Sequence, residues 1–168
     1  MKIAEIDDFL PKEYNDHLYS HLDGTEFPWF YVDTLNREYK LGNYYFCHVL
    51  IKNGKVESDF LDLFHPLLEY HKLSLDLIYK IKCNLYPRTQ FRVHHKSHTD
   101  YEYNSYPTRR TCLYYVNGNN GLTIFEKPKR RIKSIRNKAI IFNGAHPHHS
   151  TTCTDSNARI TVNIDILK

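Results

Sequence analysis

The sequence lacks any apolar run long enough to cross a membrane, and it also lacks repeats, low-complexity segments and linkers. A membrane-spanning helix needs roughly 18 apolar residues in a row, and no stretch of this chain approaches that length. The N-terminal sequence MKIAEIDDFL is acidic early and has no long apolar run, so we expect no signal peptide. A chain of 168 residues is long enough for one domain with its own core. We therefore expect a single cytoplasmic domain over residues 1–168.

Closely spaced cysteine pairs are absent as well. Structural zinc sites often use CxxC pairs, and this chain has none. The cysteines are far apart, so we expect buried, reduced thiols in a cytosolic protein. The four residues concerned are Cys47, Cys83, Cys112 and Cys153.

A strong charge imbalance is also missing. The net charge of +4 permits acidic ligands but does not by itself argue for nucleic acid. The basic run KPKRRIKSIRNK over residues 127–138 has no interleaved aromatic side chains for base stacking, so we interpret it as a solvated hairpin. Tyrosine, in contrast, is abundant at 14 residues, and its side chain packs while offering a hydroxyl to a polar cavity.

Helices are expected in the first half of the chain and strands in the second half. Apolar residues recur every four positions from Leu10 to Leu22, which predicts a helix over residues 11–22. A second helix is expected after a cap at Ser58, and Pro66 is expected to kink or split it. Short strands are predicted over residues 26–33, 44–51, 77–87, 111–117, 122–125, 139–143 and 159–167.

This order of elements predicts the fold class. Helices followed by many short strands indicate helices packed on a β unit with two sheets. We expect an α+β fold, mainly β, with N-terminal helices packed on the major sheet of a jelly-roll, or double-stranded β-helix, core. Residues 1–76 are expected to supply the helices and supporting strands, and residues 77–168 the core with the candidate site.

Three of the predicted strands each have a polar face. Side chains alternate along a strand, so every second residue lies on the same face. Such faces suit a cavity for a polar ligand inside a barrel, although strands that face water show the same pattern. The residues that share faces are Lys80, Lys82, Asn84 and Tyr86; Thr111, Leu113 and Tyr115; and Arg159, Thr161, Asn163 and Asp165.

A candidate metal site begins at the triplet His98-Thr99-Asp100. Residues two apart on an extended segment point the same way, so one metal can reach both side chains. One distant histidine would complete the two-histidine, one-carboxylate set of non-haem Fe(II) oxygenases. A catalytic zinc can use the same ligand types, so the ligands do not choose the metal. The distant candidates are His146, His148 and His149, with His94 and His95 less favoured.

A second HxD triplet occurs at His21-Leu22-Asp23, at the end of the first predicted helix. Residues two apart on a helix point in different directions, so these two side chains would not share a metal. We therefore expect His21 and Asp23 to be surface residues.

Residues 80–168 resemble the Fe(II)- and 2-oxoglutarate-dependent oxygenases of the prolyl hydroxylase type. The motifs CNLYPRTQ, HTD, TCLYYVN, GLTIF and AIIFN, then a histidine and ARITVN, follow one another in the order typical of that family. The whole chain, including IDDFLPKEY and EFPWFY, is similar to small stand-alone members often carried by phages. For a phage-encoded protein the expected compartment is the host cytoplasm.

The resemblance implies a role for each motif. His98, Asp100 and His148 would bind Fe(II), because the Ser-Thr-Thr after His148 matches the register of the family. His149 is the alternate ligand, because it lies ten residues before Arg159, a spacing that the wider family also uses. The side chain of Arg159 would bind the distal carboxylate of 2-oxoglutarate, a task that suits the guanidinium group. Collagen-type enzymes have lysine at that position, so the arginine places this chain nearer the hypoxia-type and microbial members. The residues expected to line the co-substrate pocket are Tyr86, Tyr115, Asn84, Thr161 and Asn163.

The implied reaction is hydroxylation of a C–H bond, with O₂ and 2-oxoglutarate as co-substrates and ascorbate as a supporting reductant. A prolyl residue in a protein or peptide is the leading substrate class, and small molecules remain open. Arg109 and Tyr103 are candidate substrate contacts, on a rim with Tyr101, Asn104 and Tyr106. The alternative is a non-catalytic jelly-roll that binds a metal or an anionic ligand, nucleic acid included. The sequence leaves the oligomeric state open.

Overall fold

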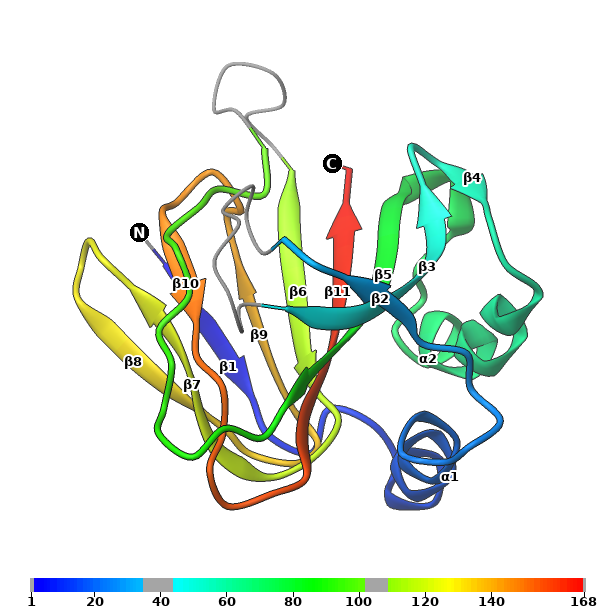
Figure 1. Cartoon of the computed structure of the whole chain (residues 1–168). Coiled ribbons are helices and arrows are strands. Elements are labelled where there is room, and N and C mark those ends of the chain that lie inside the picture. Colours follow the sequence, from blue (N-terminus) through cyan, green and yellow to red (C-terminus); the bar gives the residue numbers. More distant parts are fainter. Residues whose placement is uncertain (1, 35–43, 102–108, 168) are drawn as a thin grey trace.

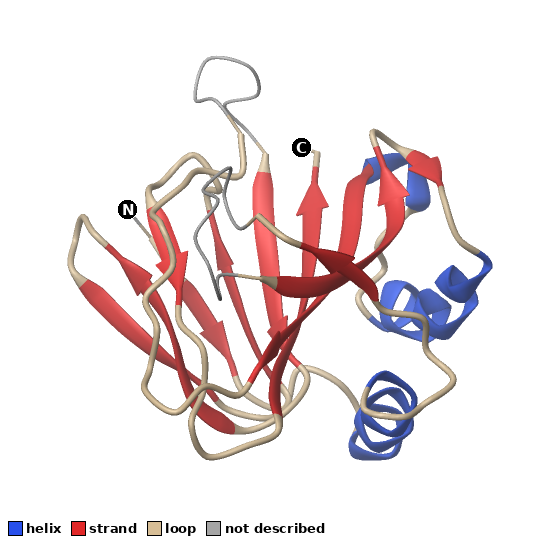
Figure 2. Cartoon of the chain, in the orientation of Figure 1, coloured by secondary structure: helices blue, strands red, loops and turns tan. Residues whose placement is uncertain are grey.

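The computed structural model describes residues 2–34, 44–101 and 109–167, which form two antiparallel sheets and a small group of helices (Figures 1 and 2). The helical elements are α1 (Lys12–Leu22), η1 (Asp59–Phe64), α2 (His65–Tyr70) and η2 (Leu75–Leu77), of which η1 and η2 are 3-10 helices. The strands of the N-terminal half are β1 (Ala4–Ile6), β2 (Phe30–Val32), β3 (Tyr45–Lys52) and β4 (Lys55–Val56). The remaining strands are β5 (Ile78–Pro87), β6 (Arg110–Tyr115), β7 (Asn119–Phe125), β8 (Arg130–Ser134), β9 (Lys138–Phe142), β10 (His148–Ser150) and β11 (Ala158–Ile166).

The two sheets differ in size and face each other across the candidate site. The larger sheet has eight strands in the order β1-β9-β6-β11-β5-β3-β2, with β4 paired to β3. The smaller sheet has the order β10-β7-β8. Figure 1 shows the smaller sheet on the left and the helices on the right, on the other side of the larger sheet. This arrangement confirms the predicted jelly-roll fold with N-terminal helices on its major sheet.

Helix α1 and the start of η1 lie where the sequence predicts, whereas η2 was not predicted. Helix α1 follows Pro11 and ends before Gly24, where an added Cβ would lie 2.7 Å from the carbonyl oxygen of Ser20. The Ser58 hydroxyl accepts a hydrogen bond from the amide of Phe60 at 3.2 Å and caps η1. Pro66 lies in the first turn of α2, where its missing N–H costs nothing. The predicted second helix is therefore split into two short elements at this point.

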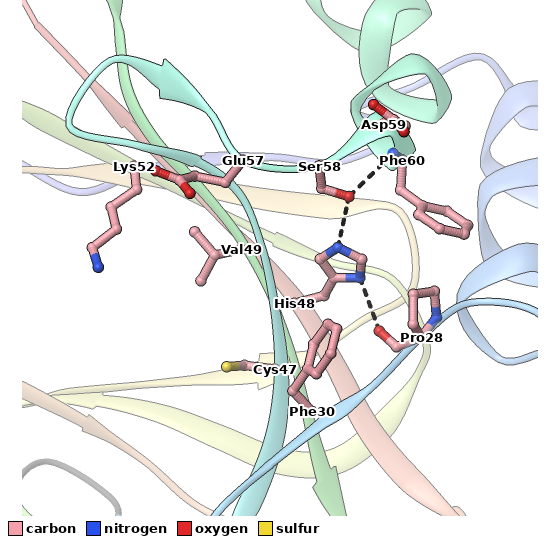
Figure 3. A pocket seen from close by; sticks show the side chains of 10 residues that line it. All are labelled: Pro28, Phe30, Cys47, His48, Val49, Lys52, Glu57, Ser58, Asp59 and Phe60. Carbon is pink, nitrogen blue, oxygen red and sulfur yellow. Dashed lines mark hydrogen bonds between the residues drawn. The ribbon is translucent and has the colours of Figure 1, made fainter.

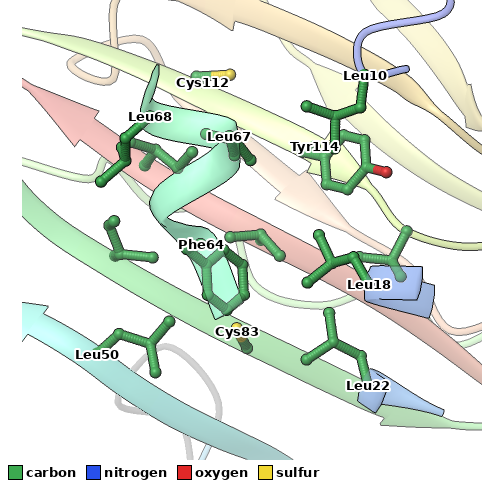
Figure 4. Close-up of a cluster of buried hydrophobic side chains, with 14 of the residues drawn as sticks. Leu10, Leu18, Leu22, Leu50, Phe64, Leu67, Leu68, Cys83, Cys112 and Tyr114 are labelled. Carbon is green, nitrogen blue, oxygen red and sulfur yellow. The ribbon is translucent and has the colours of Figure 1, made fainter. Parts of the chain in front are cut away.

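The main hydrophobic core lies between the helices and the larger sheet (Figure 4). Leu18 and Leu22 of α1 are fully buried there, beside Phe64 of η1 and Leu67 of α2. The sheet contributes the apolar face of β11, and burial of each such side chain stabilises the fold by about 1.5–3 kcal/mol. That apolar face consists of Ile160, Val162 and Ile164. The polar face of β11 therefore points the other way, toward the smaller sheet.

The basic run over residues 127–138 contains strand β8, which the sequence did not predict. Strand β8 pairs with β7 and buries Ile132, so this region is part of the smaller sheet. Its basic side chains pair with N-terminal acids, because Lys138 Nζ lies 3.1 Å from Glu5 and Arg136 lies 2.7 Å from Asp16. The expected hairpin is present, and three of its basic residues, Arg130, Arg136 and Lys138, are paired with acids of the same chain.

All four cysteines are free thiols, as predicted. Cys83, Cys112 and Cys153 are buried, and burial raises the pKa of Cys112 to about 12. Cys47 is only partly buried, because it lies on β3 near the edge of the larger sheet. Among the described residues, no helix is long and apolar enough to cross a membrane.

Candidate metal centre

The structure brings His98, Asp100 and His148 together. His98 and His148 lie directly opposite each other in an isolated antiparallel bridge, with backbone N–H···O bonds of 2.9 and 3.0 Å in the two directions. Their ring centroids are 4.5 Å apart. The amide of Asp100 donates to the carbonyl of Gly144 at 2.8 Å, which holds the carboxylate beside the rings. One nitrogen or oxygen atom from each side chain lies within 4.8 Å of the others.

The positions of the two imidazoles suit metal binding. The Nε2 atoms of His98 and His148 each lie 3.8 Å from a carboxylate oxygen of Asp100. His148 Nδ1 donates to the carbonyl oxygen of His146 at 2.8 Å, which turns Nε2 toward Asp100. Burial and the neighbouring His148 lower the pKa of His98 to about 4, so its ring is neutral at physiological pH. Two imidazoles and a carboxylate fit Fe(II), and they also fit a catalytic zinc.

A second layer of residues supports Asp100. The Thr111 hydroxyl lies 2.8 Å from Asp100 Oδ2 and 3.1 Å from Asp165 Oδ1. Asp165 is buried and pairs with Lys80 Nζ at 2.8 Å. Burial raises the pKa of Asp165, and the Lys80 ammonium opposes that change. A Cβ at Gly144 would lie 2.8 Å from Asp100 Oδ2 and 2.5 Å from Thr111 Oγ1, so only glycine leaves room for this contact.

Replacing Thr111 by valine is expected to weaken metal binding about ten-fold, because hydrogen bonds to ligand side chains orient them for the metal. Valine keeps the shape of threonine but cannot hydrogen bond to Asp100. Titration of the protein with Mn(II), followed by calorimetry, measures the effect. Thr25→Val, on an exposed residue, is the matched control. An unchanged affinity in Thr111→Val would show that the hydroxyl does not position Asp100.

Arg159 is a fully buried cation on the polar face of β11. Its Nε donates to the Ser134 hydroxyl at 2.8 Å, and one terminal nitrogen donates to the Thr123 hydroxyl at 2.9 Å. Among the residues that the structure places, no carboxylate pairs with this guanidinium. An added Cβ at Gly121 would lie 2.5 Å from Arg159 Cδ, so the glycine makes space for the arginine. A buried cation without an acidic partner is costly, and this favours an anionic ligand at the site.

A polar cavity of about 190 Å³ lies between the metal-ligand candidates and the polar faces of β5 and β11. Asn84, Tyr86 and Asn163, predicted to line a co-substrate pocket, are among its walls. Its full lining is Tyr45, Lys80, Lys82, Asn84, Tyr86, His98, Thr99, Asp100, Ser150 and Asn163. The cavity therefore joins the candidate metal ligands to the face that carries Arg159.

Tyr86, Tyr115 and Thr161 lie on the same side of the larger sheet as Arg159. The guanidinium carbon is 5.6 Å from the ring centre of Tyr86 and 5.7 Å from that of Tyr115. The Tyr115 hydroxyl donates to Thr123 at 2.9 Å, and burial raises the pKa of Tyr115 to about 12. Thr161 is buried and pairs with Asn84 across the β5–β11 ladder. These residues surround Arg159 with neutral polar groups.

The other histidines lie apart from the group of three. His149 Nε2 lies 3.4 Å from His94 Nδ1, and neither residue joins the cluster around Asp100. His95 is buried with its ring 5.1 Å from Tyr86, and burial followed by the nearby Arg159 charge lowers its pKa to about 3. His95 is therefore a neutral buried ring packed against Tyr86, a role that its sequence position did not indicate. His21 and Asp23 are exposed, as predicted.

Arg109 and Tyr101 form the described part of the predicted substrate rim. Arg109 is buried, with its guanidinium carbon 3.7 Å from the ring centre of Tyr79 and 5.0 Å from that of Tyr101. The Tyr101 hydroxyl lies within hydrogen-bond distance of the Arg109 carbonyl and of the Asn143 side-chain oxygen. The substrate role of Arg109 stays a prediction. Tyr103, Asn104 and Tyr106 lie outside the described residues.

A larger hollow of about 580 Å³ lies near the edge of the larger sheet, where His48 is buried (Figure 3). His48 Nδ1 lies 2.8 Å from the carbonyl of Pro28, and Nε2 lies 2.8 Å from the Ser58 hydroxyl. Both ring nitrogens are thus already hydrogen bonded, and the Nε2 contact holds Ser58, the cap of η1. Within the described ranges, the only group of three or more residues that could hold a metal is the one around Asp100.

Comparison with known proteins gives structural matches only. No family model matches the chain, and no curated protein sequence matches it. A viral collagen prolyl hydroxylase from Paramecium Bursaria Chlorella virus-1, solved with 2OG, matches with a TM-score of 0.61 and 16% identity over 99% of this chain and 96% of that one. A 2OG-Fe(II) oxygenase family oxidoreductase from Burkholderia pseudomallei matches with a TM-score of 0.64 and 11% identity over 98% and 84%. The chain has the fold of the 2-oxoglutarate- and Fe(II)-dependent oxygenases.

A third match extends this likeness to an enzyme solved with a peptide. The prolyl hydroxylase from Trichoplax adhaerens, in complex with a peptide fragment of the hypoxia inducible factor oxygen degradation domain, has a TM-score of 0.67. It is 14% identical over 98% of this chain and 83% of that one. At such low identity the likeness establishes the fold, and the chemistry has to be argued from the residues of the site.

Proposed function

We propose that the protein is a non-haem Fe(II)- and 2-oxoglutarate-dependent oxygenase that hydroxylates a C–H bond. One observation carries this proposal. A cluster of two histidines and one aspartate lies beside a polar cavity. A buried arginine, which no carboxylate in the described part of the chain pairs with, lies on a sheet face that lines the same cavity. The first group suits a metal with open coordination positions, and the second suits a carboxylate.

In this proposal His98, Asp100 and His148 hold the Fe(II) ion, and Arg159 holds the distal carboxylate of 2-oxoglutarate. When bound, Fe(II) and 2-oxoglutarate supply the activation of O₂, with succinate and CO₂ as the co-substrate's products. His146 fixes the ring of His148 through its carbonyl, and Thr111 fixes the carboxylate of Asp100. The buried rings of Tyr86 and Tyr115 exclude water from the arginine.

We further propose a prolyl residue in a protein or peptide as the substrate. The matched viral enzyme is a collagen prolyl hydroxylase, and the matched Trichoplax enzyme was solved with a peptide. Nucleic acid is a weaker candidate, because Arg136 and Lys138 of the basic run are paired with acids of the same chain.

Succinate formation tests the proposed function. We expect the protein to convert 2-oxoglutarate to succinate when Fe(II), O₂ and ascorbate are present, and to do so faster with a hydroxylatable peptide. His98→Ala is expected to abolish this turnover. Two results together would instead indicate the non-catalytic jelly-roll: the wild type forms no succinate, and His98→Ala binds Fe(II) as tightly as the wild type.

A further inference from the structure

Two lysines of β5, Lys80 and Lys82, line the cavity beside the candidate metal ligands. They lie opposite Asp165 and Asn163 of β11 in the antiparallel ladder. Lys80 forms an ion pair with Asp165 at 2.8 Å. Lys82 Nζ instead lies 2.8 Å from the Tyr45 hydroxyl and 4.8 Å from the centre of the Tyr45 ring. The two lysines therefore have different partners.

Lys82 has a charge that no described acid balances. Over the ranges that the structure covers, no carboxylate lies within ion-pair distance of its ammonium group. Tyr45 does not balance it either, because burial raises the pKa of that hydroxyl to about 12 and keeps it neutral. Lys82 thus presents a cation to a cavity whose other walls are mostly neutral.

Binding of the proposed metal and co-substrate would not neutralise the charge of Lys82. The two positive charges of Fe(II) offset the two negative charges of 2-oxoglutarate. The carboxylate of Asp100 offsets Arg159, and Asp165 offsets Lys80. The cavity therefore keeps one positive charge, on Lys82, after every proposed ligand is bound.

Lys82 and Arg159 lie at different positions along the strands of the larger sheet. Arg159 pairs with Tyr86, and Lys82 is four residues away on β5, which is about 13 Å along the strand at the usual rise per residue. Lys82 is instead a wall of the cavity that His98, Thr99 and Asp100 also line. An anion on Lys82 would therefore lie beside the candidate metal ligands, away from the co-substrate's distal carboxylate.

We propose that Lys82 binds an anionic group of the substrate, a carboxylate or a phosphate, and so selects acidic substrates. This inference rests on the proposed function, because it assigns the end of the cavity beside Lys82, His98 and Asp100 to the substrate and the end toward Tyr86 and Arg159 to the co-substrate. Lys80 acts differently, because Asp165 already neutralises it, and it holds the Asp165–Thr111–Asp100 contacts in place. The substrate class is therefore set by one lysine that no acid among the described residues neutralises.

Calorimetry with matched peptides tests this proposal. The protein is loaded with Mn(II) and saturating 2-oxoglutarate, which occupies the co-substrate site without turnover. It is then titrated with acetyl-Asp-Pro-amide against acetyl-Asn-Pro-amide, and with acetyl-phosphoserine-Pro-amide against acetyl-Ser-Pro-amide. We expect the acidic member of at least one pair to bind about ten-fold more tightly, with the preference falling as salt rises. The pair that shows the preference distinguishes a carboxylate from a phosphate.

Variants of Lys82 then locate the charge. Lys82→Met is expected to abolish the preference and change the Kd for 2-oxoglutarate less than two-fold, whereas Lys82→Arg keeps the preference. Lys55→Met, on exposed strand β4, is the matched control. Equal binding of acidic and neutral peptides by the wild type, or no binding of either, would overturn the proposal. So would a Lys82→Met variant that loses 2-oxoglutarate affinity instead.

Failure of the proposed oxygenase function can be distinguished from failure of the proposal for Lys82. If the protein binds neither Mn(II) nor 2-oxoglutarate, the oxygenase proposal is wrong, and the metal-free protein is titrated with inorganic phosphate. Phosphate binding by the wild type that is lost in Lys82→Met would support the anion site even though the protein is not an oxygenase. Phosphate binding that is absent or insensitive to Lys82→Met would overturn the anion site as well.

Discussion

Arg159→Leu is expected to raise the Kd for 2-oxoglutarate at least about 100-fold while leaving the affinity for Mn(II) unchanged. Removal of one partner from a buried charge pair typically costs about 2–5 kcal/mol, and 2.7 kcal/mol corresponds to roughly 100-fold. The metal ligands should not respond, because Arg159 contacts Ser134 and Thr123 and not the cluster around Asp100. Calorimetric titrations with each ligand measure the two affinities.

A second, independent prediction for Arg159→Leu concerns its thermal stability. The ligand-free wild type holds a buried cation with no acidic partner among the described residues, which is unfavourable. Leucine removes that cost, at the loss of two hydrogen bonds to hydroxyl groups. We therefore expect the Tm of ligand-free Arg159→Leu to equal or exceed that of the wild type. Added 2-oxoglutarate should raise the Tm of the metal-loaded wild type only.

Arg131→Leu is the control, because Arg131 is exposed on β8. If Arg159→Leu keeps full affinity for 2-oxoglutarate, Arg159 has a structural role and does not bind the co-substrate. A large drop in the Tm of ligand-free Arg159→Leu would lead to the same conclusion.

Alanine at His148 and at His149 should have opposite consequences. His148→Ala is expected to weaken Mn(II) binding at least about 100-fold, because one of three protein ligands is lost. His149→Ala should change the affinity less than about two-fold, because its ring lies beside His94, away from Asp100. The two variants differ by one position and remove the same side chain, so each serves as the control for the other. The reverse order of effects would exchange the two assignments.

Alternation along strands accounts for most of what the sequence could predict about the site. The period of two places Arg159, Thr161, Asn163 and Asp165 on one face of β11, and the structure has them there. Two residues at i and i+2 on an extended segment also explain the pairing of His98 with Asp100. These are local rules, so they do not depend on knowing the fold.

The sequence pattern alone could not show which of the clustered histidines is the metal ligand, and the fold was needed for that choice. Pro147 interrupts the alternation, so strand parity does not extend from the preceding segment into β10. The backbone bridge between His98 and His148 decides which ring meets Asp100, and it joins distant parts of the chain. Resemblance to known oxygenases pointed to His148, and the bridge supplies a physical reason for that prediction.

The supporting contacts could not be predicted from the sequence for the same reason. The contacts from Thr111 to Asp100 and Asp165 join three separate segments. Gly121 and Gly144 matter only because side chains of distant residues occupy the space that a Cβ would need. The short strands β1, β4, β8 and β10 were also missed, because two to five residues give little periodic signal.

The charge-transfer absorption of Fe(II) chelated by a 2-oxo acid tests the central claim most directly. Under anaerobic conditions, the wild-type protein with Fe(II) and 2-oxoglutarate is predicted to develop this visible band, which neither ligand alone produces. His149→Ala should keep the band, whereas His98→Ala and His148→Ala should lose it. A wild-type protein without the band, or a band that persists in His98→Ala, would contradict the proposed site.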